Sequence, residues 1–258
     1  MYKDFIRKNI KYKRLVFITQ ISILIGFIII WEVLARLNLI NTFITSSPYE
    51  ILKTIINLFK NNDLFYHIWI TLKETLIAFT LTSLISLIIS IILYKSDFLA
   101  KVIDPYLTML NSLPKVALGP ILIIWIGANS KSIITMGILI SVIVSIETIY
   151  NGFKNTSHTK IKLMKTFKSS EFNIFTRLVF PSNIKTIVST LKINISMSLI
   201  GIIMGEFLTS KAGIGYLILY GSQVFNLNLV MTGIIILLIL SLLLYNLIRI
   251  IEKRLDNY

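Results

Sequence analysis

The sequence predicts an all-α membrane protein that crosses the bilayer six times. Of its 258 residues, 55% are hydrophobic and 15% are charged, whereas a soluble domain carries about 25% charged residues. Six apolar runs are each long enough to span a hydrocarbon core, which takes about 20 helical residues. The net charge of +14 is gathered at the ends of these runs. That is the pattern of topology signals, not of a nucleic-acid binding stripe.

The six predicted spans differ in character along the chain. They are residues 15–37, 68–93, 102–126, 132–150, 187–208 and 227–251. The first follows a basic tail, residues 1–14, and is too long for the apolar core of a signal peptide. The second carries Ser and Thr at intervals, which let helices approach closely and bond to each other within a bilayer. The sixth is the most uniformly aliphatic run.

The third predicted span is interrupted by three prolines: Pro105, Pro114 and Pro120. Each proline removes a backbone donor and kinks a helix. Irregular backbone at membrane depth persists only where protein or water covers it. We therefore predict a broken helix beside a pathway, with Pro114, Gly119, Pro120 as candidate pathway residues. The alternative is a kink between packed helices that makes no contact with a substrate.

The positive charges predict the orientation. The N-terminal tail holds six Lys/Arg, the 94–101 connection two, the 151–185 segment seven and the C-terminal tail three. The intervening connections, residues 38–67, 127–131 and 209–226, hold two, one and one. Lysine and arginine accumulate on the cytoplasmic side. Both termini and the 151–185 loop are therefore expected in the cytoplasm, which requires an even number of spans.

A short surface helix is expected before the second span. Residues 49–60 (YEILKTIINLFK) show helical apolar periodicity, and Pro48 follows two serines, which is a helix-start signal. This segment is predicted to lie on the outer membrane face.

Among the ionisable residues of the predicted spans, Glu206 is the strongest candidate for a functional role. It follows a face of small residues near the outer end of the fifth span and is a candidate for a gate, or for packing against Lys211. The other charges have simpler structural explanations: pairing of Glu32 with Arg36, snorkelling of Lys73 and Lys192, and neutralisation of Glu147 by the basic loop.

Catalytic and metal sites are not predicted. The chain has no Cys and two His, and it contains no Gly-Lys dipeptide, so the phosphate-binding P-loop is missing. No cofactor is expected, and any ATP that drives this protein must bind to another chain.

The basic loop between the fourth and fifth spans has two amphipathic parts. Residues 160–168 place apolar and basic side chains on adjoining faces, and residues 174–179 form a second apolar stripe that Pro181 is expected to end. Such a helix pair fits a groove in a soluble partner. The alternative is a basic stretch that rests on anionic lipid.

Four segments carry a resemblance to a known family: residues 113–120 (LPKVALGP) with Trp125-Ile126-Gly127 after them, 147–153 (ETIYNGF), 162–181, and 205–218 (GEFLTSKAGIGYLI). Together they resemble the inner-membrane permease subunit of binding-protein-dependent ABC importers, in the nitrate/taurine/aliphatic-sulfonate branch. The resemblance extends over nearly the whole chain, from about residue 46 to residue 254.

The resemblance implies one permease domain, residues 15–258, in the bacterial inner membrane. It also implies partners: two copies of an ABC ATPase, an extracytoplasmic solute-binding protein and a second permease, which is another copy of this chain in a homodimer or a different permease in a heterodimer. The residues that it assigns to the ATPase contact are Lys162, Leu163, Met164, Lys165, Thr166, Phe167, Lys168, Ser169, Ser170 and Pro181. Permeases of this kind serve sulfonates, taurine, nitrate, and vitamin or pyrimidine precursors, so the substrate stays open.

The loop departs from the family pattern at two places. Residues 162–164 replace its Glu-Ala-Ala start, and Lys168 replaces a glycine that allows a left-handed turn between two short helices. Two rival functions are a secondary transporter driven by an ion gradient and a membrane-embedded assembly factor. The first predicts buried acidic relays or an inverted repeat, and neither is evident in the sequence.

Overall fold

The computed structural model describes residues 2–61 and 63–255, which form helices joined by turns. No strand occurs in these two ranges, so the predicted all-α class is confirmed. Within them, five single helices are long and apolar enough to cross a membrane, and the bent pair α5–α6 brings the number to six. The single helices are α1 (Tyr2–Arg36), α4 (Asp63–Lys95), α7 (Ser130–Lys154), α11 (Ile184–Thr209) and α13 (Leu227–Leu255).

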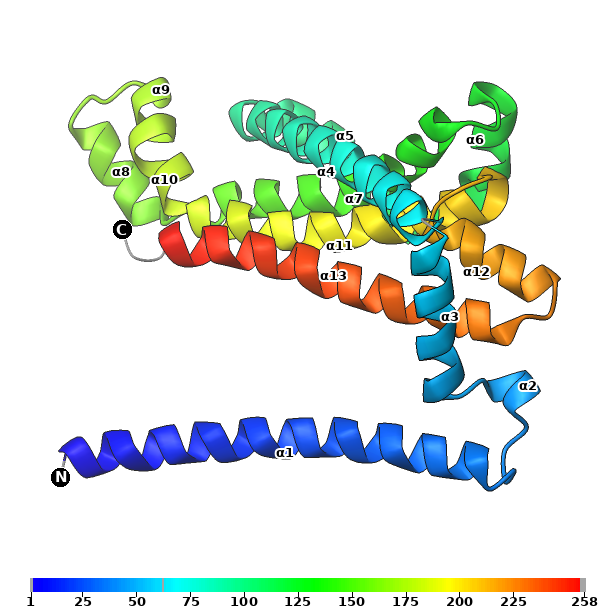
Figure 1. Cartoon of the computed structure of the whole chain (residues 1–258). Coiled ribbons are helices and arrows are strands. Elements are labelled where there is room, and N and C mark those ends of the chain that lie inside the picture. Colours follow the sequence, from blue (N-terminus) through cyan, green and yellow to red (C-terminus); the bar gives the residue numbers. More distant parts are fainter. Residues whose placement is uncertain (1, 62, 256–258) are drawn as a thin grey trace.

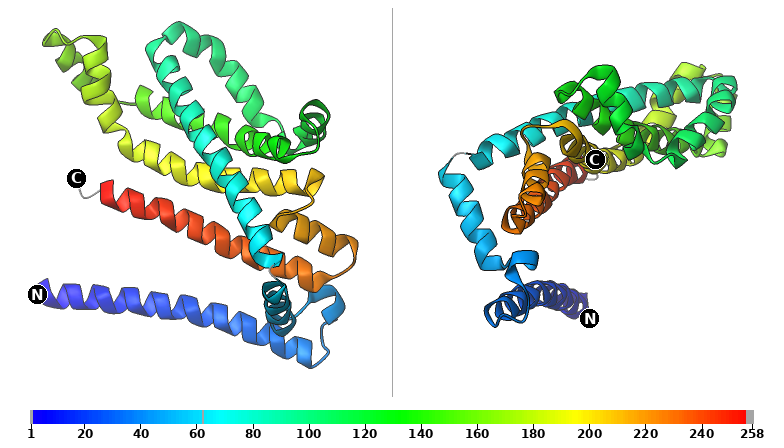
Figure 2. Two further views of the ribbon diagram at one scale, coloured as in Figure 1. Left: turned by 45° about the horizontal axis from the view of Figure 1, so that its top comes forward. Right: turned by 90° about the vertical axis from the view of Figure 1, so that its right-hand side faces the viewer.

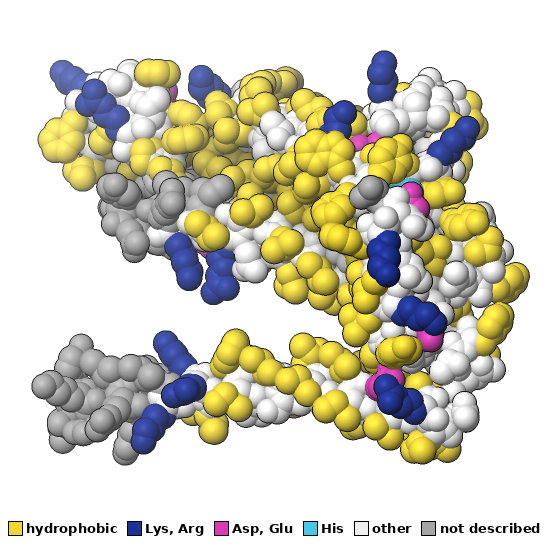
Figure 3. Space-filling view, in the orientation of Figure 1, with side chains coloured by type: hydrophobic (Ala, Val, Ile, Leu, Met, Phe, Trp, Pro, Cys, Tyr) yellow, Lys and Arg dark blue, Asp and Glu magenta, His cyan; other side chains and the backbone are white. Residues whose placement is uncertain are grey.

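The crossings alternate in direction. In Figure 1, α1 begins and α13 ends at the same end of the molecule, where α8 (His158–Thr166), α9 (Glu171–Ile174) and α10 (Phe180–Ser182) also lie. The opposite end carries α3 (Pro48–Lys60) and α12 (Ile214–Gln223). Lys and Arg side chains gather near both ends, and apolar side chains cover the length between them (Figure 3). The basic loop and both ends of the described chain thus share one side, as the charge pattern predicts.

The third crossing is two helices and not one kinked span. Helix α5 (Asp97–Ser112) ends at Leu113, and the short 3-10 helix η1 (Lys115–Leu118) leads into α6 (Gly119–Ile126) at an angle of 89° to α5. Leu113 is extended (φ −68°, ψ 139°) because the proline ring that follows it excludes the helical conformation. Pro105, in contrast, lies inside α5 without ending it.

Helix α7 is the centre of the bundle, with α4 and α11 packed along it. Glycine permits the closest approach: a Cβ atom at Gly201 of α11 would lie 2.5 Å from the Cα of Gly137 in α7. Buried hydroxyls bond across the same helices, since Thr82 of α4 lies 2.9 Å from Ser141 of α7, and Ser90 Oγ donates to the carbonyl of Ile146 (3.0 Å). The predicted role of small hydroxyl residues in helix contact is confirmed.

Helix α1 stands apart from this bundle. It packs against α3 at one end, and the most apolar part of its span is 0% buried. Both views in Figure 2 show it separated from the other crossings. The expected ion pair forms on its surface, between Arg36 Nε and Glu32 Oε1 (2.7 Å).

The predicted surface helix is present as α3, which starts at Pro48. The Ser47 side chain accepts a hydrogen bond from the backbone N–H of Glu50 (3.3 Å), which caps the helix, and Ile51 is buried beneath it. Its placement on the outer membrane face stays a prediction.

Lys192 does not snorkel as the sequence suggests. Its Nζ donates to both carboxylate oxygens of Glu252 in α13 (2.7 and 2.8 Å), so the charge is neutralised by a residue 60 positions away. The pair joins α11 to α13 near the end where the basic loop lies.

Candidate functional site

The loop between α7 and α11 is fixed firmly to the end of the bundle. Ile174, Phe175 and Val179, from α9 and the π-helical turn η2 (Phe175–Val179), are buried against Phe153 of α7. The rings of Phe153 and Phe175 lie 5.5 Å apart, and Tyr94 of α4 packs on both. The predicted apolar stripe at 174–179 is confirmed as the anchor of the loop.

The exposed surface of the loop is apolar and basic together. Leu163 and Phe167 of the α8 turn are 57% and 73% exposed, and Phe172 is exposed in α9. Lysines surround them, all exposed: Lys160, Lys162, Lys165 and Lys168. An exposed aromatic rimmed by charge is typical of a protein contact.

Met164 points the other way. It is half-buried and packs with Ile161 against the anchoring cluster, so it supports the loop from within. Of the residues expected at a partner contact, Leu163 and Phe167 therefore offer the apolar surface, whereas a charge at Met164 would disturb the loop itself.

Lys168 adopts the left-handed turn that glycine would make easy. Its φ is 55°, and the backbone N–H groups of Lys168 and Ser169 donate to the carbonyls of Lys165 (2.8 Å) and Met164 (3.1 Å). These two bonds form a Schellman motif at the end of α8. The Cβ atom costs about 1 kcal/mol in this conformation, and the turn forms in spite of it.

This turn gives the first prediction. Lys168→Gly should relieve the strain of about 1 kcal/mol, and so slow hydrogen exchange of the Ser169 amide roughly fivefold. Lys168→Ala removes the charge but keeps the Cβ atom, and should leave the exchange rate unchanged. Amide exchange followed by mass spectrometry checks both variants. Equal slowing by glycine and alanine would show that charge, and not backbone strain, limits the turn.

The second helix of the loop, α9, starts with a side-chain cap. The Ser170 side chain accepts from the backbone N–H of Asn173 (3.3 Å), which caps α9. Lys165 Nζ lies 2.8 Å from Glu171 Oε1 across the turn, and this hydrogen bond raises the pKa of Lys165. Both side chains are exposed, so the pair shapes the surface more than it stabilises the loop.

Pro181 follows the apolar stripe without ending the helix. It sits at the start of α10, is exposed, and the helical path continues almost directly into α11. The residue that fixes this junction is Asn183, which the sequence analysis missed. It is buried, and its Nδ2 donates to Thr156 Oγ1 and to the carbonyl of Val179, both at 2.8 Å. It ties the start of α11 to the end of α7.

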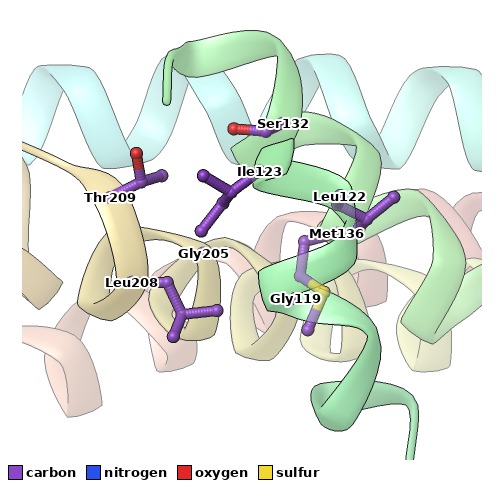
Figure 4. Close-up of a pocket in the computed structure, with 8 residues that line it drawn as sticks. All are labelled: Gly119, Leu122, Ile123, Ser132, Met136, Gly205, Leu208 and Thr209. Atoms are coloured by element: carbon purple, nitrogen blue, oxygen red, sulfur yellow. The ribbon is translucent and has the colours of Figure 1, made fainter. Parts of the chain in front are cut away.

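The candidate pathway residues of the third crossing have different surroundings. Pro114 and Pro120 are exposed at the bend. Gly119 is buried, and a Cβ atom there would lie 2.3 Å from Leu208 Cδ1. A cavity of about 10 Å³ lies beside it, which is room for about one water molecule. Figure 4 shows its lining: Gly119, Leu122, Ile123, Ser132, Met136, Gly205, Leu208 and Thr209. Gly119 thus serves close packing here.

Glu206 holds the start of α12. It is fully buried in α11, and its carboxylate accepts from Thr71 Oγ1 of α4 and from the backbone N–H of Gly215, both at 2.6 Å. A carboxylate is stabilised by the first amides of a helix. A Cβ atom at Gly213 (φ 109°) would collide with this carboxylate, at 2.3 Å. Lys211, the packing partner expected from the sequence, is exposed. A role of Glu206 in a gate stays a prediction.

Comparison with known proteins identifies the arrangement. Residues 82–257 match the family described as the inner membrane component of binding-protein-dependent transport systems. The chain belongs to this family. Membership decides against the two rival functions, and it makes the protein a transport subunit and not a catalytic enzyme. The matched residues run from within α4 to residue 257 and so include the bent third crossing, the basic loop and Glu206.

Individual relatives agree with the family. The chain is 29% identical over 219 residues to a probable ABC transporter permease of Haemophilus influenzae, with 84% of this chain and 88% of that protein covered. It is 24% identical to a putative aliphatic sulfonates transport permease of Bacillus subtilis, over 88% and 83% of the two chains. The resemblance to the sulfonate branch is confirmed. An inward-facing methionine ABC transporter shares the fold, with a TM-score of 0.65 at 17% identity over 72% of this chain and 93% of that chain.

Proposed function

We propose that the α8–α9 loop is the surface through which a separate ATPase drives this permease. The observation that carries the proposal is the pairing of an exposed apolar tip, Leu163 and Phe167, with a rigid base. The tip is free to enter a partner's groove, and the buried cluster around Phe153 and Phe175 transmits its movement to the spans. Residues 162–170 form the contact, and Pro181 lies at its edge.

The base of the loop connects to the bundle along two routes. Phe175 packs on Phe153 at the end of α7, and Asn183 bonds Thr156 at the junction with α11. Because α7 and α11 are in close contact along their length, a displacement of the loop moves them as one body. Closure of an ATPase pair would in this way switch the spans between inward-facing and outward-facing arrangements.

The partners follow from the two ends of the molecule. Two ATPase copies and the ends of α1 and α13 lie on the cytoplasmic side, where the lysine and arginine excess places the loop. The extracytoplasmic binding protein meets the opposite end, which carries α3 and α12. A second copy of this chain completes the pathway, as a homodimer. Residues 15–258 are one membrane domain that follows the basic tail, residues 1–14. Residues 62 and 256–258 of this domain lie outside the described structure.

Side-specific thiol labelling tests the orientation, and the chain is suited to it because it has no cysteine. Thr159→Cys in α8 should react with a membrane-impermeant maleimide in inside-out vesicles. It should not react in cells that have an intact inner membrane and no outer membrane to keep the reagent out. Gln223→Cys in α12, exposed at the opposite end, should show the reverse. Labelling of Thr159→Cys from outside would overturn the proposal, because no ATPase could then reach the loop.

A further inference from the structure

Three polar side chains form a continuous chain next to the bend of the third crossing. Lys115, the first residue of η1, donates from Nζ to Asn111 Oδ1 of α5 (3.0 Å). Asn111 in turn donates from Nδ2 to Glu147 Oε2 of α7 (3.0 Å). The amide therefore bridges a cation and an anion that come from different elements of the fold.

This polar chain lies within the helices that are long and apolar enough to cross a membrane. Asn111 is fourteen residues beyond the first residue of α5, or about 21 Å along the helix, and Glu147 is seven residues, or about 10 Å, before the last residue of α7. A hydrocarbon core about 30 Å thick includes both positions. Charged groups at such a depth are costly in contact with lipid, and they face protein or a water-filled space.

The three side chains are not enclosed by their own chain. Asn111 is exposed, and Lys115 and Glu147 are half-buried. Two other charged side chains of the spans are satisfied within the chain: Lys192 pairs with Glu252, and Glu206 is buried on Thr71 and Gly215. The Lys115–Asn111–Glu147 chain therefore faces something outside this polypeptide.

The backbone next to it also requires water or protein. The chain turns by 89° between α5 and α6, with an extended Leu113 and with prolines at 114 and 120 that lack amide donors. Such irregular backbone is tolerated at membrane depth where it lines a cavity or is covered by protein.

We propose that Lys115, Asn111 and Glu147 form a contact point for the solute on the translocation pathway. The proposal rests on the proposed function as a permease. Lys115 supplies positive charge and spare N–H donors, and Glu147 supplies a carboxylate acceptor. The Asn111 side-chain amide, which bridges the two, can give up its hydrogen bonds to both. The site suits a small zwitterion, whose acidic group takes the place of Asn111 on Lys115 while its amino group binds Glu147.

Thiol labelling of the cysteine-free chain tests this placement in the purified complex with its ATPase. Asn111→Cys should react with a charged methanethiosulfonate at least about tenfold faster than Met109→Cys, because only a hydrated thiol forms the reactive thiolate. Met109 is the matched control, since it is 65% exposed on the same helix and points to a different side. Equal rates at the two positions would overturn the inference.

The charges are tested by comparing an anionic with a cationic methanethiosulfonate at Asn111→Cys. Adding Lys115→Gln should lower the ratio of anionic to cationic rates, and adding Glu147→Gln should raise it, each by about threefold. Ratios that do not respond would show that the two charges do not face the pathway. A complex that purifies without its ATPase contradicts the proposed function instead, so the two failures are distinguishable.

The solute class has its own measurement. Taurine, a zwitterion, should slow labelling of Asn111→Cys more than ethanesulfonate, which has the acidic group alone. Equal slowing by both compounds, or slowing by neither, would overturn the assignment to a zwitterion.

Discussion

Replacing Phe167 by Asp should separate this permease from its ATPase while leaving the permease itself intact. Phe167 is 73% exposed in the single chain, so the substitution removes no internal packing. In the complex it would put an unpaired carboxylate into an apolar contact, at a cost of about 2 kcal/mol. That cost weakens the contact roughly thirtyfold. The measurement is the fraction of ATPase retained after mild detergent extraction, together with ATP hydrolysis stimulated by the binding protein.

Phe98→Asp is the matched control for this experiment. Phe98 is 74% exposed and lies near the start of α5, after the turn that ends α4, outside the α8–α9 loop in sequence. Its substitution should leave ATPase retention unchanged. If Phe167→Asp keeps full retention and full stimulation, the ATPase contact lies elsewhere on the loop. Met164→Asp is a poorer probe, because Met164 packs inside the loop and its loss would disturb the fold as well as the contact.

Replacing Gly201 by Val should disrupt the centre of the bundle. A Cβ atom at Gly201 would lie 2.5 Å from Gly137 Cα and 2.9 Å from the Met136 carbonyl oxygen. These are backbone atoms, which yield only if α7 and α11 move apart. Overpacking of this kind costs about 1–3 kcal/mol or more. Thermal unfolding in detergent should show a marked fall in Tm and a smaller monodisperse fraction.

Gly26→Val provides the comparison. Apart from the nearby backbone of its own helix and its two chain neighbours, no heavy atom lies within 4 Å of a Cβ atom built at Gly26, which is in the exposed helix α1. The same change of residue type should therefore leave the Tm nearly unchanged. A similar fall in both variants would mean that loss of glycine, and not the contact between α7 and α11, sets the stability.

Hydropathy and charge predicted the number of membrane-crossing helices and their alternating direction well, because both can be read from short stretches of sequence. A run of about 20 apolar residues has one way to cross a bilayer, and lysine counts report which end stays inside. Pro48 after Ser47 marked the start of α3 for the same reason, since a helix cap is made by neighbours in sequence. The third crossing shows the limit, because three prolines indicate irregularity but do not indicate which one sets the 89° bend.

The contacts that define the candidate sites are tertiary and were not predictable. Lys192 meets Glu252 across 60 residues, and Glu206 meets Thr71 across 135. No spacing rule joins such positions. Asn183 gave no sequence signal, because a buried asparagine in a polar loop looks like any turn residue. The left-handed Lys168 was unexpected because the residue type argues against that conformation, and two backbone hydrogen bonds outweigh it.

The isolation of α1 has a consequence for how the chain tolerates change. Apart from its contact with α3 at one end, α1 packs on little else in the described chain, so exchanges among Leu, Ile, Phe and Val in its membrane part should be nearly neutral. The membrane part of α1 is also not covered by other helices of the chain, so a charged side chain would be destabilising on any of its sides. Helix α7 differs: its buried serines form hydrogen bonds, and its contact with α11 at Gly137 leaves no room for an added carbon on Gly201. Among related sequences, we therefore expect apolar side chains of different sizes to replace one another in α1, and polar and apolar side chains of similar size to replace one another in α7.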